Sequence, residues 1–195
     1  MFSYELASKD GFGKEARGIN EGHGDIMASL AEFYYLGAGG TGNFLPDVVA
    51  SWNWGGRMVD PPSYGPWSIK DKDGKVLSSW KGFKYYDNTV AQSEEHASGC
   101  LYGHIFILLA RGASPDKTSV YWSMYTSLGT QGIGVDSAAR LWYRATTVYF
   151  PNDPTFFGIR AAYLLAATDL FGANSREYRA VMNAFHAGGI GSKAT

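Results

Sequence analysis

Two acidic residues near the start of the chain, Glu21 and Asp25, are the side chains whose types and spacing first suggest chemistry. They head an apolar segment in which Ile26, Leu30 and Phe33 recur at helical intervals. On a helix, residues four apart lie on one face. Two interpretations stay open at this point. The carboxylates are either a solvated helix start favoured by the dipole, or a buried metal ligand and a neighbour that holds another ligand in place.

The composition indicates one folded domain that must position these side chains. A chain of 195 residues with 45% apolar and 18% charged residues can bury a real core and is not disordered. The net charge of −1 gives no electrostatic case for nucleic acid or an anionic membrane. No apolar run reaches the ~18 residues needed to span a bilayer, and no signal peptide precedes Phe2. Cys100 is the single cysteine, which excludes an internal disulfide.

The first half of the chain combines one helix with a long irregular segment. The carboxylates lie on a predicted helix of about 17–37, which ends where a run of glycines begins. Residues 43–93 hold prolines and tryptophans without a strong helical pattern, so we expect an irregular insertion. Within it, 71–75 is a plausible hairpin turn.

The second half, 98–195, predicts a helical bundle. Residues 98–110 are apolar almost all round, which is typical of a buried central helix. The sequence therefore predicts a single all-α domain over 1–195, a helical bundle with a long irregular loop insertion. The remaining predicted helices are a weak one at 118–128, one at about 136–149, one that starts at Asp153-Pro154 and runs to Leu170 with Gly172 as its cap, and one that starts at Asn174 with Glu177 in a capping box.

Four blocks of sequence resemble the C-terminal helical domain of thermolysin-like zinc metallopeptidases. Asn20-Glu21-x-x-x-Asp25 resembles the family's third-ligand motif, and Gly56-Arg57-Met58-Val59-Asp60-Pro61 resembles the substrate-arginine segment of its vibriolysin and pseudolysin branch. Residues 94–110 resemble the stretch with the catalytic histidine. Residues 132–187 resemble the family's helical domain, notably in GIGVDSAARLWYRATT and RAAYLLAATDLFG. The blocks follow the family's order and cover most of the chain.

The resemblance implies a role for each matching residue. Glu21 would be the carboxylate ligand of a zinc ion bound by two histidines and one glutamate. Asp25 would accept a hydrogen bond from a zinc-bound histidine. His96 would donate to the oxyanion that forms when water attacks the substrate, and Glu94 would orient His96. Arg57 would bind a substrate carbonyl with its planar donors.

Two matches depart from the family. Glu94 stands where the family usually has aspartate, so its extra methylene is expected to change the placement of the His96 imidazole. Glu32 matches a calcium ligand, but Asn43 replaces an aspartate of that site, which implies a calcium site with less charge.

Other residues that could do chemistry have no matching role. His104 and His186 are interpreted as structural, and Cys100 as a small buried apolar residue. His23 lies on roughly the opposite helix face from Glu21, so the two do not share a metal.

The H-E-x-x-H motif, which gives the family two zinc-binding histidines and the general base, does not occur in the sequence. One protein ligand does not hold catalytic zinc, so we expect the isolated chain not to cleave peptides. The first hypothesis is therefore the C-terminal part of a zinc metalloendopeptidase, acting on peptide or protein substrates once another segment completes it. The alternative is a non-catalytic remnant that serves as a binding or interaction module. A third is an unrelated helical module that binds sugars or peptides through its Trp-rich loop.

The resemblance also predicts where the chain acts and what covers it. It implies a secreted protein. In the family, the H-E-x-x-H helix packs on the helix that carries Glu21 and Asp25, so that face would otherwise be exposed. We therefore expect self-association or a partner over it.

Overall fold

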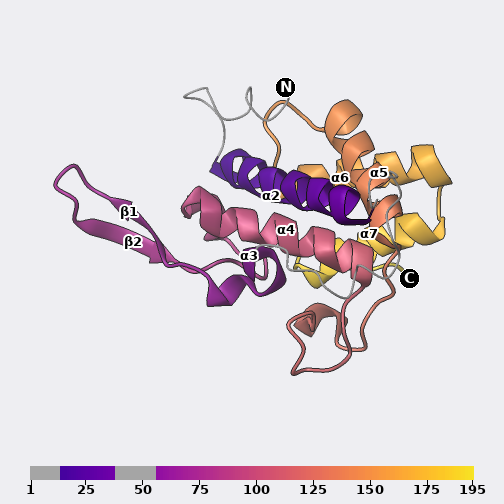
Figure 1. Ribbon diagram of the computed structural model, residues 1–195, viewed down its shortest axis with the longest axis horizontal. Coiled ribbons are helices and arrows are strands. Elements are labelled where there is room, and N and C mark those ends of the chain that lie inside the picture. The colour runs from indigo at the N-terminus through magenta and orange to yellow at the C-terminus, as the bar shows by residue number, and fades with distance from the viewer. Residues whose placement is uncertain (1–13, 38–55) are drawn as a thin grey trace.

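The computed structural model describes residues 14–37 and 56–195 (Figure 1). Within these ranges the one sheet is a two-stranded hairpin, so the fold is helical, as the sequence predicts. No helix of the described residues is long and apolar enough to cross a membrane. The elements are α2 (Lys14–Gly37), α3 (Gly56–Val59), η2 (Pro61–Ser63), β1 (Trp67–Lys70), β2 (Val76–Trp80), η3 (Val90–Gln92), α4 (Glu95–Arg111), η4 (Met124–Thr126), α5 (Val135–Arg144), the π-helical turn η5 (Ala145–Tyr149), α6 (Phe156–Phe171) and α7 (Arg176–Ala187).

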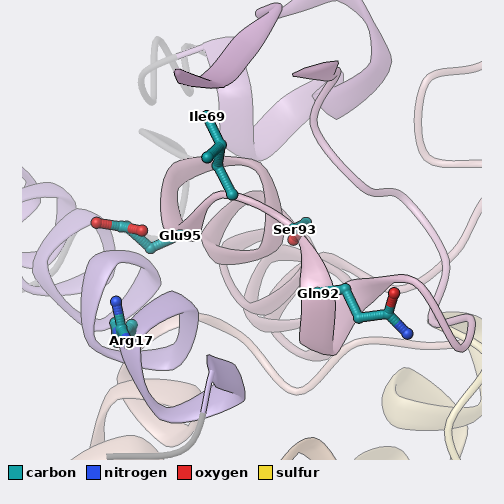
Figure 2. A pocket seen from close by; sticks show the side chains of 5 residues that line it. All are labelled: Arg17, Ile69, Gln92, Ser93 and Glu95. Carbon is teal, nitrogen blue, oxygen red and sulfur yellow. The ribbon is translucent and has the colours of Figure 1, made fainter. Parts of the chain in front are cut away.

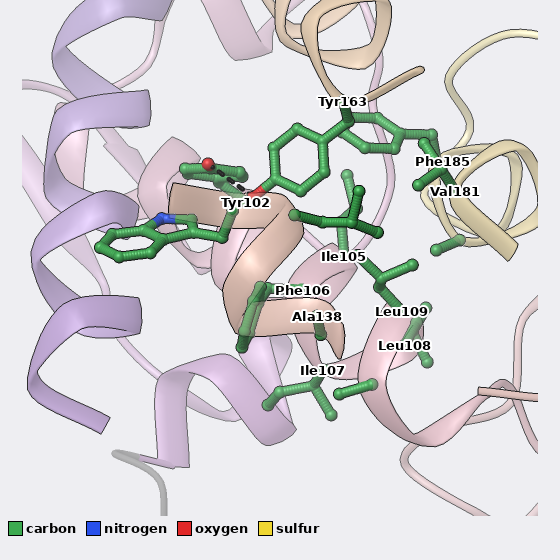
Figure 3. Close-up of a cluster of buried hydrophobic side chains, with 14 of the residues drawn as sticks. Tyr102, Ile105, Phe106, Ile107, Leu108, Leu109, Ala138, Tyr163, Val181 and Phe185 are labelled. Carbon is green, nitrogen blue, oxygen red and sulfur yellow. Dashed lines mark hydrogen bonds between the residues drawn. The ribbon is translucent and has the colours of Figure 1, made fainter. Parts of the chain in front are cut away.

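Helix α4 is the centre of the core, as its apolar sequence predicts. All its residues from Ala97 to Ala110 are buried. Helices α2, α5 and α7 all pack against it. On the side of α6 and α7, Tyr102 and Tyr163 share a hydrogen bond of 3.0 Å between their hydroxyl groups, and the Tyr163 ring packs edge-on against Phe185 (Figure 3). These aromatic side chains are fully buried, so they stabilise the bundle chiefly by removing apolar surface from water.

Helices α2 and α4 lie side by side with their backbones in close contact (Figure 1). A Cβ atom added at Gly22 would lie 2.5 Å from the carbonyl oxygen of Gly99, and one added at Gly18 would lie 2.1 Å from Oγ of Ser98. A Cβ atom at Gly99 would lie 2.9 Å from Cβ of Glu21. These glycines are needed because a side chain at any of the three positions would push the helices apart.

The segment between α2 and α4 contains the predicted hairpin. Strands β1 and β2 are antiparallel, with Trp67 opposite Trp80 and Ile69 opposite Ser78. The Asp71 carboxylate closes the turn by accepting from two backbone N–H groups, those of Asp73 and Lys75. The hairpin projects from the helical body (Figure 1). The glycine-rich run at 38–42, Asn43 and the two tryptophans at 52 and 54 lie outside the described residues.

The predicted helix at 118–128 is wrong. Side chains in this segment make hydrogen bonds to nearby backbone groups, and these bonds compete with those of a helix. Asp116 accepts from the backbone and hydroxyl of Thr118. Ser123 accepts from the Tyr125 N–H, so only the short turn η4 forms.

The other predicted helices form with shifted ends. The helix expected over 136–149 ends as α5 at Arg144 and continues as the π-helical turn η5. The cap of α6 is Thr155 rather than Asp153, because its hydroxyl accepts from the Gly158 N–H at 3.0 Å. The cap of α7 is Ser175, because Asn174 takes a left-handed conformation with φ 60°. Gly172 ends α6 as predicted.

Candidate active site

His96 lies between two carboxylates. Its Nε2 is 3.2 Å from Oε2 of Glu21 on α2, and its Nδ1 is 2.6 Å from Oε1 of Glu94. Burial opposes the charged imidazole, but the hydrogen bond to Glu94 and the charges of Glu21 and Glu94 outweigh it, so the pKa of His96 is raised. In the charged form both ring nitrogens donate, and each carboxylate accepts one hydrogen bond.

Glu94 holds the imidazole in spite of its extra methylene. It is the N-cap of α4, and its Oε2 accepts from the backbone N–H of His96 at 3.0 Å. Its other oxygen accepts from the ring of the same residue. One carboxylate therefore fixes both the backbone and the side chain of His96.

Asp25 and Arg57 form a second pair one turn further along α2. The guanidinium Nε of Arg57 donates to Oδ2 of Asp25 at 2.7 Å, and its Nη2 donates to the other oxygen. This two-point contact suits the planar guanidinium. The side chains are only 26% and 19% exposed, so the pair is partly buried.

The packing of α2, α3 and α4 explains why these residues meet. The close approach at Gly22 and Gly99 brings Glu21 to the first turn of α4, where His96 lies. Met58, next to Arg57 on α3, fills the space over Gly103, at which an added Cβ would lie 2.7 Å from the Met58 Cγ. The Met58 carbonyl also accepts from Nδ1 of His104 at 2.9 Å. Helix α3 is thereby anchored so that Arg57 reaches Asp25.

The described residues do not fit a zinc ion by themselves. Among them, no group of three or more His, Cys, Asp or Glu side chains could hold a metal. Glu21 is the one family ligand present, and it contacts His96. Both oxygens of Asp25 accept from Arg57. A zinc site needs three or four protein ligands, so no catalytic step is assigned to zinc on this chain.

Glu32 lies on the same side of α2, beyond Asp25. The two carboxylates line a pocket of about 180 Å³ with Ala28, Ser29 and Met58. Two carboxylates are fewer than the six to eight oxygen ligands that calcium takes. The described residues therefore leave the predicted calcium role of Glu32 without support, and Asn43 lies outside them.

The remaining histidines have other partners, and the Cys100 thiol donates to the backbone carbonyl of His96 at 3.1 Å. His23 is buried against the Trp142 ring at 4.7 Å between centroids, and burial lowers its pKa to about 4. His104 is fully buried, and burial lowers its pKa to about 4. His186 contacts the Gly191 carbonyl through Nδ1. Burial raises the pKa of Cys100 to about 12, so its thiol stays neutral and unreactive.

Sequence reasoning missed Trp67 of β1. Its ring lies nearly parallel to the His96 imidazole, at 10° between planes and 6.4 Å between centroids. The sequence gives a partial signal, because Trp67 opens the first strand of the predicted hairpin. The position of that strand beside α4 depends on contacts between residues far apart in the chain, and local sequence patterns do not predict such contacts.

Comparison with known proteins shows to which family the chain is similar. Residues 11–190 match the family described as the thermolysin metallopeptidase, alpha-helical domain. The chain is 32% identical over 187 residues to the transglutaminase-activating metalloprotease of Streptomyces mobaraensis, covering 93% of this chain and 23% of that protein. It is 30% identical over 177 residues to bacillolysin of Bacillus cereus, covering 90% of this chain and 28% of the relative. It is 28% identical over 177 residues to thermolysin of Alicyclobacillus acidocaldarius, covering 90% of this chain and 29% of the relative.

The chain thus spans about a quarter of the length of these curated relatives. The match covers nearly all of its own residues, including every block in which the resemblance was found. The chain belongs to the thermolysin metallopeptidase family and corresponds to its alpha-helical domain.

Proposed function

We propose that this chain supplies the helical wall of a peptidase site, which a polypeptide carrying the H-E-x-x-H helix completes. The observation that supports this most is the meeting of Glu21, Asp25, Arg57 and His96 across three helical elements. These are the residues to which the family resemblance gives roles. Peptide or protein substrates and zinc follow from the family and are part of the proposal.

Each residue would act on the substrate in a way that its position favours. His96 donates from Nε2 to the carbonyl oxygen of the scissile peptide as negative charge develops there. Glu94 keeps the imidazole oriented and charged for this task. Arg57, held by Asp25, donates to a neighbouring carbonyl of the peptide. Glu21 leaves His96 when the site is completed and becomes available as a ligand.

The test is complementation. The chain would be assayed with zinc and a fluorogenic peptide, first alone and then mixed with a second polypeptide that carries the H-E-x-x-H helix of a relative. We expect no cleavage by the chain alone and cleavage in the mixture. The Glu21→Gln chain should give no cleavage in either condition. Cleavage by the chain alone would refute the metal argument, and an inactive mixture would favour the alternative, a non-catalytic interaction module.

We also propose that the completing polypeptide binds the face of α2 that carries Glu21 and Asp25. Ala28, three residues after Asp25, is exposed on that face, and Ala31 and Met27 continue the exposed surface around the helix. Small residues let another helix approach closely, and an apolar patch next to a polar site is typical of an interface. In its absence we expect the chain to self-associate through this face.

Light scattering checks this expectation. Ala28→Lys should lower the association of the chain, whereas Leu128→Lys, at a position that is 93% exposed after η4, should not. A monodisperse monomer of the unaltered chain would count against the proposal.

Secretion, which the resemblance implies, is checked by locating the protein in cell and medium fractions of the producing organism.

A further inference from the structure

Residues that line the site follow one another along α2 at intervals of one turn. Asp25 binds Arg57, Glu21 contacts His96, and Arg17 comes four residues before Glu21. Residues four apart lie on one face of a helix, so Arg17 extends the same row. The row of side chains that face the site therefore continues past Glu21 to Arg17, which lines a pocket of about 70 Å³.

Three other elements close this pocket (Figure 2). Ile69 reaches it from β1, Gln92 from the end of η3, Ser93 from the residue that follows, and Glu95 from the first residue of α4. Glu95 directly precedes His96, so the pocket adjoins the candidate active site. Arg17 and Glu95 carry opposite charges, but no ion pair joins them and the described residues give the Arg17 guanidinium no hydrogen bond, so its donors remain available.

One face of the hairpin covers both the pocket and His96. Side chains two apart on a strand point to the same face, so Trp67 and Ile69 share one. Trp67 lies over the imidazole of His96, and Ile69 lines the pocket. The face is continuous with the site, and it offers an aromatic ring followed by an aliphatic side chain.

The spacing along α2 matches an extended peptide. From Arg17 to Asp25 a rise of about 1.5 Å per residue gives roughly 12 Å. An extended chain covers about 3.4 Å per residue, so three to four peptide residues span the distance from Arg57 to the pocket.

We propose that the pocket lined by Arg17, Ile69 and Glu95 is a side-chain subsite for an extended peptide that passes over His96. The subsite takes an aliphatic side chain against Ile69, three to four residues from the one whose carbonyl contacts Arg57. Arg17 donates to a carbonyl of the same peptide and packs its methylenes beside the aliphatic group. This subsite rests on the proposed function, because it needs a peptide at the candidate site.

Binding to the full chain tests the subsite without requiring cleavage. The probes are hexaalanine blocked at both ends and six variants in which one alanine in turn is leucine. Dissociation constants are measured by calorimetry for the parent chain, Ile69→Ser and Leu77→Ser. Leu77 is the matched control, because it is an aliphatic side chain on the other strand of the same hairpin, is 61% exposed and does not line the pocket.

We expect leucine at one position to tighten binding about fivefold or more. The gain should disappear in Ile69→Ser and persist in Leu77→Ser. Arg17→Ala should weaken all seven peptides, since its bond is to the peptide backbone, and should weaken the favoured leucine peptide most, because the Arg17 methylenes pack beside that side chain. An equal gain in Ile69→Ser, loss of the gain in Leu77→Ser, or no binding at millimolar peptide would each overturn the subsite.

The outcome is separable from that of the proposed function. Cleavage in the complementation mixture without an Ile69-dependent leucine position would overturn the subsite alone. An Ile69-dependent position without cleavage in any mixture would overturn the proposed catalytic role and leave the subsite in place.

Discussion

The crossing of α2 with α4 and the β1–β2 hairpin both border His96, but they are built in different ways. At the crossing, glycines bring two helix backbones together and nearly every neighbouring side chain is buried. The hairpin is a short two-stranded element whose residues are mostly exposed, including Ile69, Val76 and Leu77.

The helix crossing therefore positions the side chains of the site, whereas the hairpin influences which ligand the site selects. A larger side chain at the crossing does not fit between the helices, so it changes both the stability of the fold and the distance between Glu21 and His96. A substitution on the hairpin meets solvent, so it leaves the fold intact and changes what the site contacts. Loops and exposed hairpins on a rigid scaffold commonly carry binding determinants for this reason.

The largest expected effect is on the core of α4. Phe106 is 1% exposed, and Phe106→Ala removes a buried ring that its neighbours cannot replace. We expect the free energy of unfolding to fall by about 3–5 kcal/mol. Denaturant unfolding measures it, and a loss of less than about 1 kcal/mol would show that this part of the core is not tightly packed.

Gly22→Ala should come next, with Gly24→Ala as its matched control on the same helix. The added Cβ at Gly22 meets a backbone carbonyl at 2.5 Å, whereas an added Cβ at Gly24 has nothing within 4 Å. We expect Gly22→Ala to destabilise the chain by about 1–3 kcal/mol. Gly24→Ala should stabilise it by about 0.5–1 kcal/mol, because alanine favours the helix. Equal effects of the two substitutions would contradict the close crossing.

The two helices of this crossing could be predicted from the sequence but their close approach could not, and the pairs around His96 could be predicted only in part. The apolar residues of α2 and α4 predict both helices, because the pattern that indicates a buried helix lies within the local sequence. The Asp71 turn and the Gly172 cap are likewise local. The contact of Glu21 with His96 and that of Asp25 with Arg57 join residues far apart in the chain. Only the family resemblance brought these residues into one site, and it did not predict these pairings.

The helix expected at 118–128 failed for a related reason. Its Ser and Thr side chains bond to nearby backbone, an alternative that helical periodicity does not weigh. The place of Trp67 beside His96 could not be predicted either, because a hairpin's docking depends on the packing of its partners.

Glu94→Gln tests how the charge of His96 is held beside the crossing. The substitution keeps an oxygen to cap α4 but removes the charge, so the pKa of His96, raised in the parent, should fall. Glu95→Gln is the control, since Glu95 makes no contact with the imidazole. NMR titration of the imidazole measures the pKa of His96 in both variants.

The raised pKa of His96 also sets a pH dependence of stability. The stabilisation from charged His96 is complete below the unfolded pKa near 6.5 and is lost as pH rises through the higher folded value. Glu94→Gln should flatten the unfolding free energy over that range. An unchanged slope would mean that Glu94 does not hold the charge.

The smallest effect is expected on the hairpin. Leu77→Ser should change the free energy of unfolding by less than about 0.5 kcal/mol, because the side chain is 61% exposed. Thermal unfolding of the variant beside the parent checks this. A larger loss would mean that the hairpin contributes to the core and is more than a wall of the site.

The proposed function is tested most directly by the rate of peptide cleavage in the complementation mixture, measured with the parent chain and with His96→Ala. The proposed function predicts no cleavage by the parent chain alone, cleavage in the mixture, and a rate lower by about 10²–10³-fold with His96→Ala. Cleavage by the chain alone, or an equal rate with His96→Ala in the mixture, would contradict it.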